Sequence, residues 1–257
     1  MPHRIIFALQ KGGVGKSSST VAVAEILAEL GYRVLVVDFD PQGNSSRMLT
    51  GESIYQHRGH TIMEAVEAGD ARPYLLTINE NLDLIPAEDR LATFSRHIYT
   101  SGIRNPHAVL KRLLEPIEHE YDFVFVDIGP SLGDTVVNAI AYADAIIIPV
   151  DLGDLAMESM IRFIEFVDAA VAKGHSHAEV AGILLTMKDS RVKNEREIGE
   201  GIREMYGELV FSAEINRRAR IKEIASKGID LKDPSMGDYI AFTEELITRL
   251  QKKGSTV

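Results

Sequence analysis

The sequence predicts an α/β fold, a doubly wound and mostly parallel sheet with helices on both of its faces. The first observation is a set of short β-branched and aliphatic runs without polar alternation, which are typical of strands buried on both faces of a parallel sheet. The second is that these runs alternate with segments of helical periodicity, which favours right-handed strand–helix–strand crossovers. Because such sheets bind ligands at the carboxyl ends of their strands, functional residues are expected directly after the apolar runs.

The elements follow in order from these patterns. A first strand is expected at 4–9 (RIIFAL), followed by a glycine-rich turn and a helix at 17–30 that Gly31 ends. The other expected strands are the apolar runs at 33–38, 122–127, 144–150 and 180–186. The other expected helices lie at about 61–68, 106–115, 131–142, 154–173, 194–206 and 236–252. Thr61 and Glu64 have the spacing of a capping box.

Composition narrows the possible functions of the 257 residues. The chain has no cysteine, which excludes a disulfide framework, a thiolate zinc site, a cysteine nucleophile and a cysteine-ligated iron–sulfur cluster. No repeat, linker or break in composition is present, so residues 1–257 are expected to form a single domain. No apolar run reaches the ~18 residues of a membrane span, and the first residues do not resemble a signal peptide. A cytoplasmic protein is expected.

Charge is distributed unevenly along the chain. The net charge is -10, which argues against a whole surface made for nucleic acid. The acidity lies in residues 1–180, whereas residues 181–257 carry 14 basic and 13 acidic residues. The C-terminal part could therefore present a local basic face.

A phosphate-binding loop is predicted directly after the first strand. The Walker A pattern fits at Gly15, Lys16 and Ser17, although Gln10 occupies the position of its first glycine. Glycines let backbone N–H groups surround phosphate oxygens, and the following helix adds its positive N-terminus. Lys16 is expected to reach the β- and γ-phosphates of ATP, and the Ser17 hydroxyl to complete a Mg²⁺ shell. ATP and Mg²⁺ are thus the expected cofactors.

Further blocks of sequence carry a family resemblance. Lys11 is the first residue of KGGVGKS, where the deviant Walker A ATPases have their signature lysine. VLVVDFDPQGNSS, NLDLIPA, YDFVFVDIGPSLGDTVVNAI, ADAIIIPV, ILLTMKDSR and INRRARIKEIASKG follow in order. With these blocks, which span nearly the whole chain, the sequence resembles the ParA family of ATPases, which segregate plasmids and chromosomes.

The resemblance implies an ATP-dependent sandwich dimer in which Lys11 reaches the phosphates bound by the partner subunit. It places Lys11, Lys16 and Asp40 in catalysis, with Asp40 positioning or activating the attacking water. The residues that the resemblance implies for nucleotide binding are Lys11, Gly12, Gly13, Val14, Gly15, Lys16, Ser17, Ser18, Asn216 and Arg217.

Carboxylates follow two of the expected strands. An extended Asp38-Phe39-Asp40 places both carboxylates on one side, toward the phosphate loop. The resemblance implies an outer-sphere contact of Asp38 with Mg²⁺. Asp127 follows FVFV as a Walker B aspartate should, and is expected to hold Mg²⁺ through a water. Ser17, Asp38 and Asp127 are the expected metal-site residues.

Two strand-flanking features remain. Relatives commonly read D-T-P-P-S-L where this chain has Ile128 and Gly129 after Asp127, and this departure could loosen the following loop. Asp144 and Asp151 bracket another expected strand and are interpreted as turn or cap residues.

A basic cluster lies near the C-terminus, at Arg217, Arg218, Arg220 and Lys222. The resemblance implies that Arg191, Arg217 and Arg220 bind double-stranded DNA without sequence preference in the ATP-bound dimer. Symmetry would double a modest patch, which could let an acidic protein hold DNA. The alternative is a solvated helix whose charges pair with Glu214 and Glu223.

Partners and rival functions also follow from the resemblance. It implies a ParB-type centromere-binding protein that stimulates hydrolysis, and a nucleoid-associated location. The alternatives are a same-fold ATPase that positions a protein cargo, a MinD-like membrane regulator and a small-molecule ligase. No membrane partner is expected, because the final helix carries Glu244 and Glu245 and few lysines.

Overall fold

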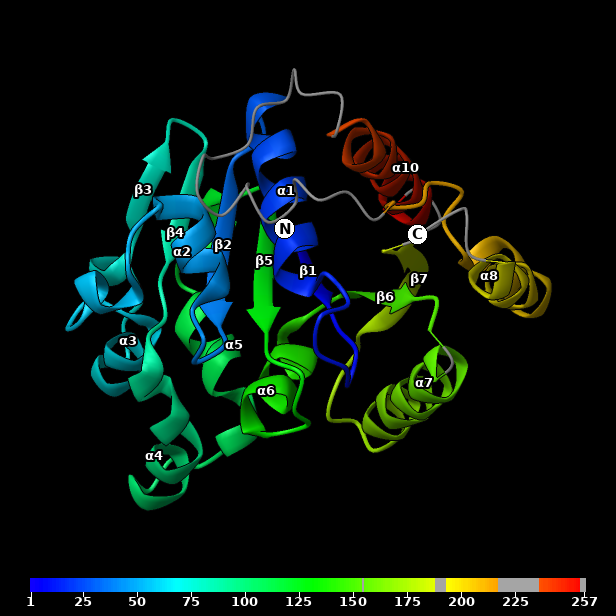
Figure 1. Cartoon of the computed structure of the whole chain (residues 1–257). Helices are drawn as coiled ribbons and strands as arrows, with labels where there is room; N and C mark the ends of the chain where they lie inside the picture. Colours follow the sequence, from blue (N-terminus) through cyan, green and yellow to red (C-terminus); the bar gives the residue numbers. More distant parts are fainter. Residues whose placement is uncertain (154, 188–192, 217–235, 255–257) are drawn as a thin grey trace.

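A seven-stranded sheet forms the centre of the molecule (Figure 1). The computed structural model describes residues 1–153, 155–187, 193–216 and 236–254. The strands are β1 (His3–Phe7), β2 (Val34–Phe39), β3 (Leu76–Asn79), β4 (Leu82–Ile85), β5 (Phe123–Ile128), β6 (Ala145–Asp151) and β7 (Glu179–Thr186). Their order is β3-β4-β2-β5-β1-β6-β7, and all neighbours are parallel except the β3–β4 pair. The predicted fold class is confirmed.

Helices cover both faces of this sheet. They are α1 (Lys16–Glu29), α2 (Asn44–Thr50), α3 (Ile62–Ala68), α4 (Phe94–Thr100), α5 (Val109–Leu114), α6 (Asp134–Tyr142), α7 (Ala156–Ala172), α8 (Lys193–Tyr206) and α10 (Gly237–Gly254). Thr61 caps α3: its side chain accepts a hydrogen bond from Met63 N, and the Glu64 side chain accepts one from Thr61 N. The predicted capping box is therefore confirmed.

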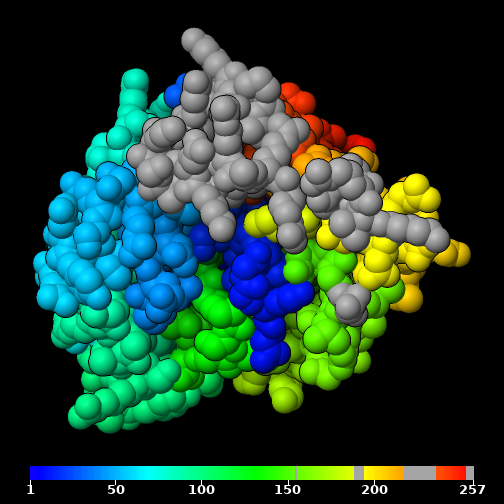
Figure 2. Space-filling view, viewed as in Figure 1, coloured from blue at the N-terminus to red at the C-terminus, as the bar shows by residue number. Residues whose placement is uncertain are grey.

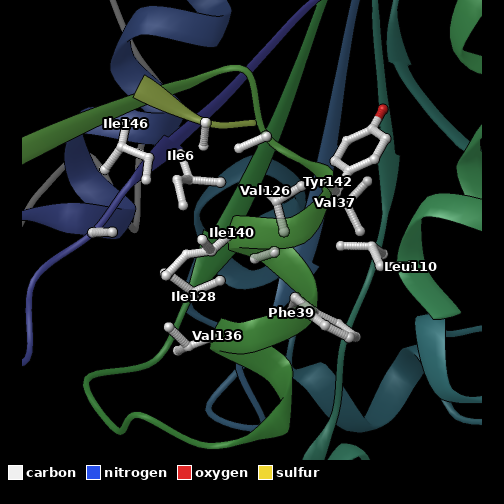
Figure 3. Close-up of a cluster of buried hydrophobic side chains, with 14 of the residues drawn as sticks. Ile6, Val37, Phe39, Leu110, Val126, Ile128, Val136, Ile140, Tyr142 and Ile146 are labelled. Carbon is white, nitrogen blue, oxygen red and sulfur yellow. The ribbon is translucent and has the colours of Figure 1, made fainter. Parts of the chain in front are cut away.

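Alternate residues of the strands belong to two separate cores. Ile5 and Phe7 of β1 face α1 and α10, whereas Ile6 faces the side of the sheet that α3, α5, α6 and α7 cover. Figure 3 shows part of the second core, where Ile6 lies near residues of β5 and α6. This alternation of two apolar faces explains why the strands contain so few polar residues.

The final helix packs on the protein. Phe242 and Leu246 of α10 are fully buried in the core that includes α1. Within the described parts of the chain, no helix is both long and apolar enough to cross a membrane.

Several expected elements differ from those observed. The five predicted strands occur with small shifts in their ends, but the β3–β4 hairpin and the helices α2 and α4 were missed. The helix expected at 131–142 begins only at Asp134, because 129–133 form the loop that leaves β5. The missed strands have four residues each and the missed helices seven, too short for a clear periodic pattern.

Candidate functional site

The loop between β1 and α1 has the geometry of an anion-binding loop. Gly13 and Gly15 have φ of 77° and 87°, a left-handed backbone that glycine adopts without a steric cost. Gly15 occupies the N-cap position of α1 and provides no side-chain cap. The first N–H groups of α1 therefore lack a side-chain acceptor and are suited to phosphate oxygens.

The same loop is anchored on both sides. Val14 is fully buried, and its carbonyl oxygen accepts a hydrogen bond of 2.9 Å from the Thr186 hydroxyl at the end of β7. The Lys16 ammonium group donates a 2.8 Å hydrogen bond to the carbonyl oxygen of Lys11. Burial lowers the pKa of Lys16, and the charges of Asp127 and Asp40 oppose that shift. Lys16 is thus a largely buried cation between the loop and the acidic strand ends.

Lys11 is bound within its own chain. Its ammonium group lies 2.7 Å and 2.9 Å from the two carboxylate oxygens of Asp151, the last residue of β6. Asp151 is therefore an ion-pair partner of the loop, and its interpretation as a turn or cap residue was wrong. Asp144, at the opposite end of β6, pairs with Arg4, so it is not merely a turn residue either. Neither pairing has a signal in the sequence, because both connect residues 140 positions apart.

Strand register brings the predicted metal-site carboxylates together. β2 and β5 are parallel neighbours, with Asp38 opposite Asp127 and Phe39 opposite Ile128. Asp38 and Asp127 are both fully buried. The strand-end prediction is confirmed for these two residues and for Asp40, which follows directly after β2 and is 7% exposed.

The start of α2 binds both buried carboxylates. Ser46 donates from its backbone N–H and its hydroxyl to Oδ2 of Asp38, each at 2.7 Å. The Ser45 hydroxyl donates to Oδ2 of Asp127 at 2.6 Å. Sequence reasoning missed these two serines, although two hydroxyl residues directly after DFDPQGN were a usable signal.

Burial and mutual repulsion disfavour negative charge here. Burial and the neighbouring Asp127 raise the pKa of Asp38, and the hydrogen bonds from Ser46 oppose the shift. Burial also raises the pKa of Asp127, against the hydroxyls of Ser45 and Ser17. A cation in this region would relieve the repulsion.

The residues present fit a magnesium ion held largely by other oxygens. Oδ1 of Asp127 is buried and has no hydrogen-bond partner within the described residues. Over the same residues, no three histidine, cysteine, aspartate or glutamate side chains are grouped to hold a metal. Because Mg²⁺ usually keeps several waters and binds substrate phosphates, one hydroxyl and nearby carboxylates are a suitable protein contribution.

Of the predicted site residues after position 187, only Asn216 lies within the described part of the chain. Asn216 is bound to Asp238 at the start of α10, through hydrogen bonds of 3.1 Å from its backbone and side-chain nitrogens. The predicted DNA-binding residues lie outside the described residues: Arg191, Arg217, Arg218, Arg220 and Lys222. Figure 2 shows the dark-blue start of the chain at the surface, between the light-blue and green parts of the sequence.

Comparison with known proteins agrees with this geometry. The family model AAA_31, described as an AAA domain, matches residues 3–180. The chain is 33% identical over 229 residues to the sporulation initiation inhibitor protein Soj of Bacillus subtilis (strain 168), covering 88% of this chain and 89% of that protein. It is 31% identical over 259 residues to the chromosome partitioning protein ParA of Caulobacter vibrioides (strain NA1000 / CB15N), covering 96% and 95%.

A solved structure matches over almost the full length. It is cobyrinic acid a,c-diamide synthase from Mycobacterium smegmatis with bound ADP and magnesium, with a TM-score of 0.84 and 25% identity, covering 98% of this chain and 97% of that one. The fold is therefore shared with an enzyme of different named function, whereas the Caulobacter relative is named for chromosome partitioning. This chain belongs to the ParA/Soj family of partition ATPases.

Proposed function

We propose that this protein is a Mg²⁺-dependent ATPase that partitions DNA by switching between nucleotide states. The observation that carries the proposal is that Lys16 lies close to Asp40 and Asp127, with Asp38 opposite Asp127, beside one glycine-rich loop. That arrangement combines cations and backbone N–H groups for a polyphosphate with carboxylates for a metal and a water.

Each residue would contribute a separate part of phosphoryl transfer. Lys16 and the first N–H groups of α1 would bind the β- and γ-phosphates. Ser17 would bind Mg²⁺ directly, and Asp127 and Asp38 would hold its waters. Mg²⁺ would neutralise developing charge on the phosphates. Asp40 would orient the attacking water, because phosphoryl transfer depends mainly on positioning and electrostatic stabilisation.

Dimerisation would complete the site. In this proposal two copies bind ATP face to face, and Lys11 of each copy approaches the phosphates held by the other. Lys11 would first have to leave Asp151, with which it pairs inside the single chain. ATP would compete for Lys11 by presenting a higher density of negative charge than one carboxylate.

DNA would serve as the track for the ATP-bound dimer. The basic cluster at 217–222 and Arg191 would contact phosphates, and two-fold symmetry would present two such patches together. DNA binding by the dimer would place the protein on the nucleoid. A ParB-type protein would stimulate hydrolysis and reset the cycle. The relatives named for chromosome partitioning favour DNA partition over the synthase chemistry of the structural neighbour.

ATP turnover and dimerisation provide the test. We expect wild-type protein to hydrolyse ATP only with Mg²⁺ and to dimerise with ATP in sedimentation velocity. Lys16→Ala should lose ATP binding, whereas Asp40→Ala should retain ATP and dimer but lose turnover. Turnover of Asp40→Ala at the wild-type rate, or normal ATP affinity of Lys16→Ala, would contradict the proposal.

A further inference from the structure

The position that a side-chain carbon would take at Gly129 faces the flat side of the Asp40 carboxyl group. A methyl carbon on Gly129 would lie 3.3 Å from Cγ, Oδ1 and Oδ2 of Asp40 alike. A point equally distant from these three atoms lies above the plane of the carboxylate and not at its edge. The lone pairs of the oxygens lie in that plane, so the contact leaves them free to accept hydrogen bonds. Oδ1 uses one to accept a 3.0 Å bond from Gln42 N.

The closeness of positions 40 and 129 follows from the sheet register. Phe39 and Ile128 are the last paired residues of β2 and β5, and the next residue in each chain segment is Asp40 or Gly129. The two positions therefore leave the sheet side by side. A side chain at 129 would have to occupy the space against which the Asp40 carboxylate rests.

Gly129 cannot easily move away. Ile128 before it is 1% exposed and belongs to the same buried cluster as Val136 and Ile140 of α6, as Figure 3 shows. Pro130 after it has a fixed φ. The chain is thus anchored at Ile128, directly before Gly129.

We propose that Gly129 is a positioning residue, which permits the observed orientation of the Asp40 carboxylate by leaving free the space that a side-chain carbon at the end of β5 would occupy. The inference rests on the proposed function, in which Asp40 orients the attacking water. It concerns a position where the sequence departs from the D-T-P-P pattern common in its relatives. The consequence is that the orientation of Asp40 depends on the absence of a side chain at 129.

The decisive variant is Gly129→Ala. The φ of Gly129 is not in the left-handed region, so alanine is compatible with its backbone and the main change is the added carbon beside Asp40. To restore an ordinary contact distance, the carboxylate must shift by a few tenths of an ångström. Because transfer steps are sensitive to displacements of that size, we expect kcat for ATP hydrolysis to fall about tenfold. The affinity for ATP should stay within about twofold, since the glycine-rich loop and Lys16 at the start of α1 are unchanged.

Gly133→Ala is the matched control. Gly133 lies in the same loop with φ -88°, and a carbon added there would meet only the Ser131 hydroxyl oxygen, at an ordinary 3.7 Å. Its kcat should remain close to that of the wild type. Equal kcat values for Gly129→Ala and Gly133→Ala would overturn the inference, as would a Gly129→Ala defect confined to ATP affinity.

A second measurement does not depend on turnover. Urea unfolding without nucleotide would compare wild type, Gly129→Ala, Asp40→Ala and the double variant. Gly129→Ala should lower the midpoint in the wild-type background but not in the Asp40→Ala background, which lacks the opposing carboxylate. An equal loss in both backgrounds would show that Gly129 does not act through Asp40. Normal hydrolysis by Asp40→Ala would instead refute the proposed function, while the unfolding comparison would still test the contact.

Discussion

Lys11 and Asp151 form an ion pair that connects the glycine-rich loop to the end of β6. The Lys11 ammonium group lies within 2.9 Å of both carboxylate oxygens, and the two side chains are 29% and 24% exposed. The lysine proposed to serve the partner subunit is therefore held by a carboxylate of its own chain. Dimer formation would exchange one electrostatic partner for another, so the strength of the intrachain pair should affect the dimer equilibrium.

Asp151→Asn should strengthen ATP-dependent dimerisation. The substitution removes the charge that holds Lys11 but keeps the size of the side chain. Because the pair is partly exposed, its contribution is modest, and we expect the dimer dissociation constant with ATP to fall about two- to fivefold. Sedimentation equilibrium with a non-hydrolysable ATP analogue would measure it.

Asp144→Asn is the control for that experiment. Asp144 lies at the opposite end of β6 and pairs with Arg4, far along the strand from Lys11. It should leave the dimer constant unchanged. Weaker dimerisation of Asp151→Asn would indicate that Asp151 supports the dimer-competent position of Lys11 and does not compete for it.

Asp38→Asn should make the nucleotide-free protein more stable than wild type, and this difference in unfolding free energy should grow as pH rises. Burial and the nearby Asp127 raise the pKa of Asp38, so the folded protein retains a proton that the unfolded chain releases. The unfolded state therefore binds fewer protons, and wild-type stability falls between the ordinary aspartate pKa and the raised one. One unit of pKa shift corresponds to about 1.4 kcal/mol, so a difference of at least ~1 kcal/mol is expected near neutral pH.

Urea unfolding of both proteins from about pH 2.5 to pH 8 would measure this difference. Glu64→Gln provides a control of opposite sign. Burial acts to raise the pKa of Glu64, but hydrogen bonds from Thr61 and Arg90 outweigh it and the pKa is lowered. Wild type should then gain stability over Glu64→Gln as pH rises through the acidic range. An Asp38→Asn difference that does not vary with pH would contradict the prediction.

Ser46→Ala should destabilise the nucleotide-free protein more than Ser45→Ala. The Ser46 hydroxyl donates to Asp38 and accepts a 2.9 Å bond from Ala87 N after β4. Alanine leaves both buried partners with one bond fewer, which costs about 1–3 kcal/mol for each unsatisfied group. Ser45 has one such partner, Asp127.

Chemical denaturation would give these unfolding free energies. Ser131→Ala is the comparison, because Ser131 is exposed and surface substitutions usually change stability by less than about 0.5 kcal/mol. Equal effects of Ser45→Ala and Ser46→Ala would mean that the bond to Ala87 N contributes little.

Sequence patterns predicted the features that depend on local spacing along the chain. They missed the contacts between residues that are far apart in the sequence. The buried strands and the capping box at Thr61 depend on local spacing, so they were predictable. Asp38 and Asp127 could be placed at one sheet edge, because parallel strands end together. The pairing of Asp151 with Lys11 could not be predicted, since it depends on β6 lying beside β1 and on the path of the loop. Gly129 was recognised as a departure, but its position beside Asp40 could be found only from the register of β2 and β5.

DNA binding should require ATP and the basic cluster, and should weaken steeply with salt. Residues 1–180 are strongly acidic, so binding is expected only where Arg217, Arg220 and their neighbours concentrate positive charge. Each phosphate contact releases counterions, so each arginine removed should reduce the magnitude of the slope of log K against log salt by about one. Arg217→Ala/Arg220→Ala should therefore reduce it by about two per monomer. Random and chosen sequences should bind about equally, because phosphate contacts carry no base information.

Fluorescence anisotropy of a labelled duplex with ADP, ATP or a non-hydrolysable analogue would test this. Arg72→Ala is the control, since Arg72 is an exposed arginine outside the basic cluster, pairs with Glu120 and lies shortly before β3. It should bind DNA like wild type. If the double variant also bound like wild type, the cluster would not be the DNA surface. Liposome co-sedimentation in parallel would distinguish DNA binding from the MinD-like alternative. If liposomes but not DNA bound the ATP form, the protein would act on a membrane and not on DNA.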